Sequence, residues 1–382
     1  MATTSVPREA MLRMMGVNAQ PYNITNINTN VVDAYTHFVS STYKGGFRIY
    51  VLMKQYRGDF PDSLDGGQTI NYSQSNAYYF LDRYLAVKNE LKAQLPGVPI
   101  YWVLTGITDK MKFIKSQAGV TVNDTGDMAE YSHGMNPNTE AAYDEINLIR
   151  AHFAQHICND EDVVEISNET DAGDNDRPGR LHMTPQQQAC QQSNAFYRIK
   201  AVAPNVKVAM GSIWTSPQYF IDMAEHCQVL RGQNNYLCWD EFNVHIYDFS
   251  NSESNYLTAL NTYKAANQAY GNLPMVLSEF GLDSPTAIGS DLRAANEASR
   301  AQRLWRYMEL AYQAGYYRAH RFILKDEKAV GDPGLRFDEC GDHTQGNVKK
   351  QSYLDLVDYV NATPSVPGIT FKLLNKKRVA IL

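Results

Sequence analysis

Residues 274–281 read PMVLSEFG, a short apolar run that ends in a glutamate, an aromatic residue and a glycine. Residues 163–169 read VVEISNE and have the same character. Short runs of aliphatic and β-branched residues bounded by turn-forming residues are typical of buried strands. Each stretch therefore predicts a strand with a glutamate at its carboxyl end, Glu169 in one and Glu279 in the other.

Further runs of this kind occur along the chain, and a longer amphipathic stretch follows each of them. The expected strands cover 12–18, 46–53, 99–106, 162–168, 206–212, 241–247, 274–279 and 318–325. Strands that alternate with helices form parallel sheets, and eight repeats favour closure into a barrel. The sequence therefore predicts the α/β class, with a single (β/α)8 TIM barrel over residues 1–362 and a C-terminal tail over 363–382.

The helices expected between the strands show an apolar period of 3.6 residues. The clearest is expected over 291–313, with Ser290 as its N-cap and Gly315 as its stop. Its apolar face consists of Ala301, Leu304, Trp305, Met308 and Tyr312. This face is expected to pack against the barrel.

Four segments rich in Gly, Asp, Asn and Thr interrupt the alternation, at 55–71, 109–138, 170–182 and 326–346. Each follows a strand and precedes a helix, which in a barrel places it at the carboxyl ends of the strands, where substrate sites are built. The segments account for the length of the chain without a second domain. They also favour a cleft that accepts internal bonds of a long substrate.

The composition excludes several classes of protein. Of 382 residues, 44% are hydrophobic and 20% are charged, which is ordinary for a globular chain. No apolar run is long enough to predict a membrane span, and the net charge of -6 gives no basic field for nucleic acid. Five scattered cysteines form no CxxC pair, so no zinc ribbon is expected, and we expect no metal or cofactor.

The first residues of the chain lack the apolar core of a secretory signal. We therefore expect a cytoplasmic or particle-associated protein, or a secreted one whose signal has been removed. The sequence leaves the oligomeric state open.

Glu169 and Glu279 are expected to face each other across the barrel mouth. Cleavage of a glycosidic bond needs two carboxyl groups, one to protonate the departing oxygen and one to attack the sugar or activate water. The alternative for either residue alone is a solvated or ion-paired position on the rim.

The dipeptide Asn168-Glu169 and the stretch Ser278-Glu279-Phe280-Gly281 resemble the signature of glycoside hydrolase clan A, whose (β/α)8 retaining glycosidases include families 5 and 39. The resemblance implies that Glu169 is the acid/base, that Glu279 is the nucleophile and that Asn168 binds the sugar 2-hydroxyl. It also implies a polysaccharide or oligosaccharide substrate, and the long segments favour endo action.

Two further motifs fit the same resemblance. His245-Ile246-Tyr247 resembles the His-x-Tyr pattern of family 5, in which the tyrosine hydroxyl binds the nucleophile. Arg48 could match the arginine of the clan's second strand, although a strand that continues to residue 53 would bury it deeply. The alternatives are core packing for His245 and Tyr247 and a structural ion pair for Arg48.

Trp214 directly follows the fifth expected strand and is the best candidate to stack on a sugar ring. Trp102, Trp239 and Trp305 are expected in the core. The eighth strand, HRFILK over 320–325, lacks the tryptophan that many clan members carry there, which leaves the identity of the bound sugar open.

Two other classes of function compete with a glycosidase. One is a non-catalytic barrel that binds glycan or forms part of a larger particle such as a virion. The other is a metal-dependent barrel hydrolase, which usually needs clustered histidines, whereas His133, His182, His245 and His320 are dispersed in this sequence.

Overall fold

A computed structural model of the protein describes residues 6–19, 43–53, 81–105, 136–172, 183–233, 237–247, 252–281, 290–322, 354, 357–360, 370–371 and 380–381. The strands of its main sheet are β1 (Gly16–Ala19), β2 (Phe47–Leu52), β3 (Ile100–Thr105), β4 (Val163–Ile166), β5 (Lys207–Ala209), β6 (Phe242–His245), β7 (Met275–Phe280) and β8 (Tyr316–Arg321). All pairings between neighbouring strands of this sheet are parallel.

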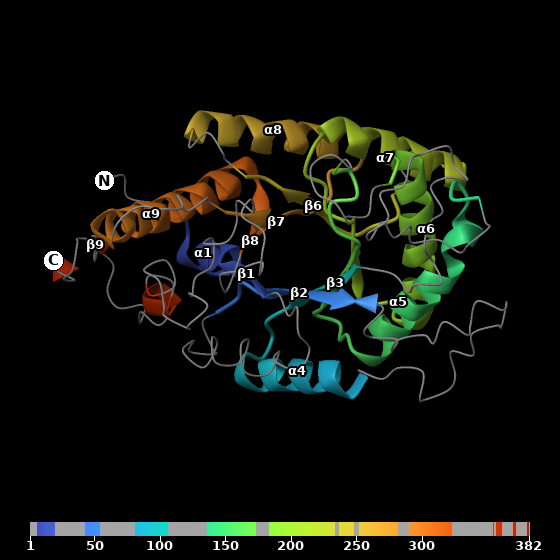
Figure 1. Cartoon of the computed structure of the whole chain (residues 1–382), viewed down its shortest axis with the longest axis horizontal. Coiled ribbons are helices and arrows are strands. Elements are labelled where there is room, and N and C mark those ends of the chain that lie inside the picture. The colour runs from blue at the N-terminus through green and yellow to red at the C-terminus, as the bar shows by residue number, and fades with distance from the viewer. Residues whose placement is uncertain are drawn as a thin grey trace.

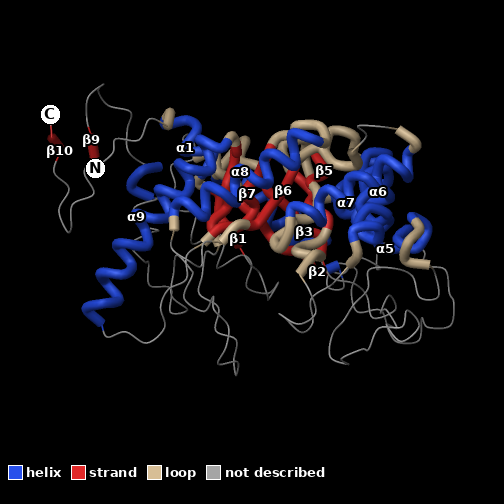
Figure 2. Tube along the Cα trace, turned by 90° about the horizontal axis from the view of Figure 1, so that it is seen from above, coloured by secondary structure: helices blue, strands red, loops and turns tan. Residues whose placement is uncertain are grey.

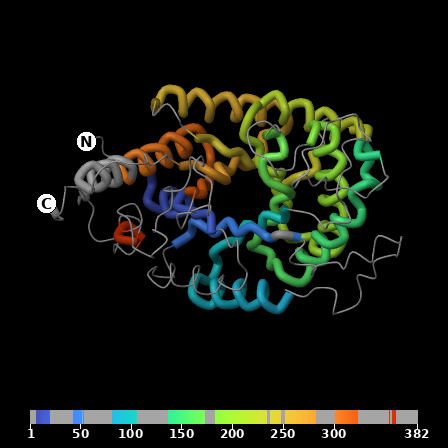
Figure 3. The backbone as a smooth tube through the Cα atoms, in the orientation of Figure 1, coloured from blue at the N-terminus to red at the C-terminus, as the bar shows by residue number. Residues whose placement is uncertain are grey.

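The eight strands close into a barrel. Their order is β5-β4-β3-β2-β1-β8-β7-β6, so β1 lies between β2 and β8. Isolated parallel bridges from Ala209 to Glu241 and from Ile213 to Val244 connect β5 with β6. Figure 3 shows the first and last barrel strands, in blue and orange, side by side. The predicted (β/α)8 barrel is confirmed.

Helices surround the sheet. They are α1 (Arg8–Met14), α4 (Leu81–Gln94), α5 (Asp144–His156), α6 (Pro185–Val202), α7 (Pro217–Arg231), α8 (Glu253–Ala269) and α9 (Ser290–Ala314), with the 3-10 turn η6 (Glu140–Tyr143) before α5. In Figure 1, α4 lies below the strands, α5 and α6 lie to the right and α7 and α8 lie above them. Figure 2 shows the same strands, in red, between α9 on one side and α5 and α6 on the other.

The first strand is shorter than predicted. Residues 12–14 belong to α1, and the strand begins only at Gly16. A short apolar run fits a buried helix as well as a buried strand, so periodicity could not separate the two. The consequence is that α1 precedes the barrel and packs against β8 and α9.

The predicted helix over 291–313 is confirmed as α9. It begins at Ser290 itself, so that residue is helical rather than the N-cap. Gly315 has φ of +97° and follows the last helical residue, as expected for a left-handed stop. Of the expected apolar face, Ala301, Leu304 and Met308 are buried, and Trp305 and Tyr312 pack partly buried against the core.

Side chains inside the barrel are unusually polar. Asn18, Arg48, Glu165, Asn243 and Glu279 come from five different strands, are buried and hydrogen-bond one another. Residues on non-neighbouring strands can meet in this way only through the interior of the barrel. The interior therefore carries a charged network, while the apolar core lies between the strands and the helices.

Several expectations lie outside the described residues. These are the segments 55–71 and 326–346, most of 109–138 and 170–182, and residues 323–325 of the eighth expected strand. Near the C-terminus, β9 (Thr370–Phe371) and β10 (Ala380–Ile381) form an antiparallel pair. None of the described helices is both long and apolar enough to cross a membrane.

Candidate active site

Glu279 is the fifth residue of β7 and is 3% exposed. Its Oε1 accepts hydrogen bonds from Arg48 Nη1 at 2.5 Å and from the hydroxyl of Tyr50. Its Oε2 accepts a hydrogen bond from the Tyr247 hydroxyl at 2.5 Å. Both oxygens of this buried carboxylate are therefore held by donors from other strands and loops.

These donors keep Glu279 ionised. Burial alone would raise the pKa of its carboxyl group, but the positive charges of His245 and Arg48 oppose that effect. Together with the hydrogen bonds from Tyr247 and Tyr50, they lower the pKa to about 2. A carboxylate that is charged and fixed in a buried site is what a nucleophile requires.

Glu169 is positioned by a left-handed backbone rather than by strand alternation. The strand ends at Ile166, earlier than predicted, because Ser167 and Glu169 have φ of 70° and 49°. Such angles are uncommon for residues with a side chain and are found mainly where a structure enforces them. Here the Glu169 N–H donates to Ser212 O at 2.9 Å, and the Ser167 hydroxyl lies 3.1 Å from Arg150 Nη2.

His245 lies between the two glutamates. Its Nδ1 is 2.6 Å from Glu169 Oε1 and 3.5 Å from Glu279 Oε2. One oxygen of each glutamate and one nitrogen of His245 all lie within 4.8 Å of one another. The carboxyl groups of Glu169 and Glu279 are therefore close, although β4 and β7 are not neighbours in the sheet.

Asn168 has a fixed amide orientation. Its Oδ1 accepts hydrogen bonds from Arg48 Nη2 at 2.7 Å, Tyr50 at 3.1 Å and Ser212 at 3.3 Å. The carbonyl oxygen therefore points into the barrel. The amide N–H₂ of this half-buried residue has no acceptor among the described residues and is therefore available as a donor.

Arg48 joins the parts of the site. Glu165 binds it at two points, with Nε to Oε2 at 2.8 Å and Nη2 to Oε1 at 2.7 Å. The Oδ1 of Asn18 accepts from Nη1 at 2.8 Å. A guanidinium held by a carboxylate at two points has a defined orientation. The remaining donors are consequently directed at Glu279 and Asn168.

Three of these groups could in principle hold a metal ion, because Glu169, His245 and Glu279 each offer one ligand atom. The Arg48 guanidinium already lies 2.5 Å from Glu279 Oε1, where its positive charge would oppose a cation. The hydrogen bonds to Glu279 fit a carboxylate that acts on an organic substrate better than a metal ligand.

The structure brings six of the seven predicted site residues into one cluster: Asn168, Glu169, Arg48, His245, Tyr247 and Glu279. Arg48 is fully buried, as expected for a strand that continues toward residue 53. Its long side chain nevertheless reaches Glu279. Trp214 follows β5 at the same end of the barrel, and its backbone N–H donates to Asp171. Its ring is half-buried, and its stacking on a sugar ring stays a prediction.

Sequence reasoning missed several polar residues of the cluster, among them Tyr50, Glu165 and Ser212. Two of them had a signal in the sequence. Tyr50 lies two residues after Arg48, so alternation places both on the same face of β2. Glu165 is a charged residue within an otherwise apolar strand. Trp102 and Trp239 are buried, as expected, and the residues after 322 lie outside the described part of the chain.

Solved structures with this fold include several glycosidases. The GH39 enzyme from Xanthomonas axonopodis pv. citri matches with a TM-score of 0.60 and 15% identity, over 91% of this chain and 66% of that chain. A monomeric β-xylosidase from Caulobacter crescentus CB15 matches with a TM-score of 0.62 and 14% identity, over 94% and 69%. The endo-β-1,4-mannanase from Thermotoga petrophila matches with a TM-score of 0.54 and 15% identity, over 91% and 76%.

The likeness lies in the fold rather than in the sequence. No protein-family model matches the sequence, and no curated protein does. This chain spans about two thirds of the length of the first two matched structures. The chain therefore shares its (β/α)8 barrel with glycosidases such as those of family 39, which confirms at the level of the fold the resemblance carried by the two glutamate motifs.

Proposed function

We propose that this protein is a retaining glycoside hydrolase that cleaves O-glycosidic bonds in a polysaccharide or oligosaccharide. The observation that carries the proposal is the pair Glu169 and Glu279, with carboxylate oxygens within 4.8 Å of each other in a buried cluster. Retaining enzymes hold their two carboxyl groups about 5–5.5 Å apart, whereas inverting enzymes need about 6.5–9.5 Å to admit a water molecule. The short separation supports direct attack on the sugar.

In the first step, the Glu279 carboxylate attacks the anomeric carbon while the glycosidic C–O bond breaks. Glu169 gives its proton to the departing oxygen, and a covalent glycosyl-enzyme forms. In the second step, Glu169 takes a proton from water, the water oxygen attacks the anomeric carbon and the ester bond to Glu279 breaks. The net reaction is hydrolysis with retention of configuration.

The charges in the cluster suit these roles. Arg48 is shared by Glu165 and Glu279, so these three groups already carry one net negative charge. A further unprotonated carboxylate beside Glu279 would therefore be unfavourable in a buried site. The site therefore favours a proton shared between Glu169 and His245, whose Nδ1 is 2.6 Å from Glu169 Oε1. That proton is the one the first step needs.

Two further groups would bind the sugar. The N–H₂ of Asn168 is directed away from Arg48 and can donate to the 2-hydroxyl next to the anomeric carbon. Trp214 would stack on a neighbouring ring. Endo action is proposed because the long segments that follow the strands in the sequence favour a cleft that accepts internal bonds of a long substrate.

A barrel without catalytic activity does not require this arrangement. Left-handed backbone angles at Ser167 and Glu169 are unfavourable, and such angles cluster at active sites where they position a reacting group. Their presence on both sides of Asn168 supports a catalytic role for Glu169 over a glycan-binding or structural one.

The proposal is tested with the full chain on a panel of β-linked glycans and aryl glycosides. A hydrolysed substrate is then followed by NMR at early times. We expect the first product to have the same anomeric configuration as the substrate. Inversion would reject the mechanism, and no hydrolysis across the panel, together with glycan binding, would favour the non-catalytic barrel.

A further inference from the structure

Arg318 is a buried cation without a carboxylate partner among the described residues. It is 8% exposed, and within the described residues its one hydrogen bond goes from Nη1 to the Tyr101 hydroxyl at a long 3.4 Å. Its Nε has no partner in the same part of the chain. The guanidinium lies over the rings of Tyr101 and Tyr317, at 5.4 and 5.5 Å from their centres. Buried charges are normally paired, because an unpaired one loses its hydration without compensation.

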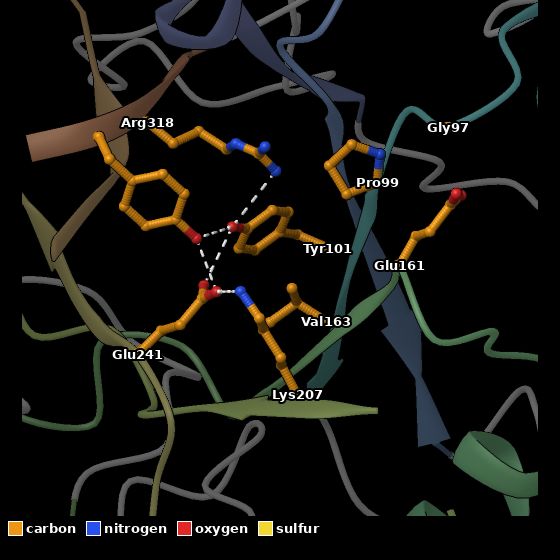
Figure 4. Close-up of a pocket in the computed structure, with 9 residues that line it drawn as sticks. Gly97, Pro99, Tyr101, Glu161, Val163, Lys207, Glu241 and Arg318 are labelled. Atoms are coloured by element: carbon orange, nitrogen blue, oxygen red, sulfur yellow. Dashed lines mark hydrogen bonds and ion pairs between the residues drawn. The ribbon is translucent and has the colours of Figure 1, made fainter. Parts of the chain in front are cut away.

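Arg318 lines a recess at the amino-terminal end of the barrel, opposite the glutamate pair. The recess has a volume of about 170 Å³ and is lined by residues at the beginnings of strands, including Pro99, Val163 and Lys207. Figure 4 shows the guanidinium of Arg318 and the side chains of Tyr101, Lys207 and Glu241 converging there. The space is larger than the roughly 30 Å³ that one water molecule occupies.

The carboxylate in the recess is already committed to other donors. Glu241 accepts hydrogen bonds from Lys207 at 2.8 Å, Tyr317 at 2.6 Å and Tyr101 at 3.0 Å. Glu161, at the edge, pairs with Lys92 at 3.1 Å. Lys207 and Glu241 pair with each other, and Lys92 is shared between Glu161 and Asp162, whose Oδ1 lies 2.8 Å from its Nζ. The recess is therefore lined by two cations and two carboxylates, and Arg318 is the cation that no carboxylate contacts within the described residues.

We propose that this recess binds a small oxyanion, with Arg318 as the principal ligand. A guanidinium presents parallel N–H donors that match a carboxylate or phosphate group, and its charge shortens and strengthens such hydrogen bonds. Lys207 lies at the same recess, and its ammonium group has further N–H donors beyond the one that binds Glu241. The site is separate from the glutamate pair and does not depend on the proposed hydrolase activity.

The bound anion would give the Arg318 guanidinium an acceptor that it does not have among the described residues. A ligand that binds only the folded protein raises its apparent stability. We therefore expect the thermal midpoint of the full chain to rise with inorganic phosphate, compared with sodium chloride at equal ionic strength. Parallel titrations with sulfate and acetate distinguish a preference for phosphate from a preference for carboxylate.

The assignment to Arg318 is tested by Arg318→Met, with Arg198→Met as the matched control, since Arg198 pairs with Asp144 at the surface. We expect the anion-dependent rise to disappear in Arg318→Met and to persist in Arg198→Met and in Glu279→Gln. If Arg318→Met does not fold, Lys207→Met should weaken phosphate binding several-fold by calorimetry. Equal binding in wild type and Arg318→Met, or no binding of any oxyanion to wild type, would overturn the proposal.

Discussion

The two ends of the barrel each contain a buried arginine, but only one of them is fully paired. At the carboxyl end, Arg48 binds Glu165 at two points and also Glu279 and Asn168. At the amino end, Arg318 has one long hydrogen bond to a tyrosine and no ion pair within the described residues. The first cluster is complete before any ligand arrives, as expected of a site prepared for a developing charge. In the second cluster, the carboxylate of Glu241 is bound by Lys207 and two tyrosine hydroxyls rather than by Arg318.

The buried glutamates of the two ends differ in a second way. Glu279 and Glu241 each accept hydrogen bonds from two tyrosine hydroxyls and one cationic side chain. Only Glu279 lies close to a second carboxyl group, that of Glu169. Hydrogen-bond donors alone therefore do not make a catalytic carboxylate. A neighbouring carboxyl group, which the proposed mechanism uses as the acid, is what distinguishes Glu279 from Glu241.

The largest effect is expected for Glu279→Gln. The amide cannot form the covalent intermediate, so kcat/KM should fall by about 10⁴-fold or more. Glu241→Gln is the matched control, because it alters a carboxylate with similar donors at the opposite end. We expect it to lower the thermal midpoint and to leave kcat within a few-fold of wild type. Steady-state kinetics and thermal unfolding measure both effects, and full activity in Glu279→Gln contradicts the assignment.

The next largest effect is expected for Glu169→Gln, and it should depend on the leaving group. On natural glycosides the variant lacks the acid, and the rate should fall by about 10²- to 10⁴-fold. Aryl glycosides with acidic leaving groups need no proton in the first step, so the formation of the glycosyl-enzyme should be much less affected. A burst of released phenol measures that step. Equal losses on both kinds of substrate would argue against Glu169 as the acid.

A smaller effect is expected on the pH dependence of activity, and it distinguishes the contribution of Arg48 to the pKa of Glu279 from that of Glu165. The pKa of Glu279 is lowered from 4.5 to about 2, so its ionised form stabilises the fold above about pH 4.5 and loses this contribution as the pH falls toward 2. The double variant Arg48→Met, Glu165→Gln removes the cation together with the charge of Glu165, so Glu279 is the one former partner of Arg48 that still carries a charge. The pKa of Glu279 should then rise, and the acid limb of kcat/KM should move to higher pH.

The single variant Glu165→Gln provides the control for that shift. It leaves Arg48 to act on Glu279 alone, so the acid limb should not move to higher pH. An upward shift in the single variant would show that Glu165, rather than the Arg48 charge, keeps Glu279 ionised.

The barrel fold and part of the candidate site could be predicted from the sequence. Eight apolar runs, each followed by an amphipathic stretch, were enough to predict the barrel, because eight such repeats are the pattern of a (β/α)8 fold. Glu169, Glu279 and the His245-x-Tyr247 pattern were visible because they stand at strand ends. The left-handed turn at Ser167 was not predictable, because it depends on contacts with Arg150 and Ser212, which are distant in sequence.

The contacts between buried polar residues could not be predicted from the sequence either. Glu165 appeared only as one charged residue within an apolar strand, and its two-point contact with Arg48 depends on how β2 and β4 face each other inside the barrel. The same limit applies to Arg318, whose lack of a carboxylate partner is a property of the assembled interior. Sequence patterns predict which face a residue occupies, and the closed barrel decides what it meets there.

The smallest effect is expected for a pair of tyrosine variants, one at each end. Tyr247→Phe removes one hydrogen bond to the charged Glu279, which is worth about 1.5–3 kcal/mol and corresponds to a loss in kcat/KM of roughly 10- to 100-fold. Tyr317→Phe removes the equivalent bond to Glu241 at 2.6 Å and should lower the thermal midpoint without changing kcat/KM. Both substitutions delete one hydroxyl near a buried carboxylate, so differences in packing cancel. If Tyr317→Phe impairs hydrolysis as much as Tyr247→Phe does, the two ends are coupled, and the separation of a catalytic mouth from an anion-binding recess is wrong.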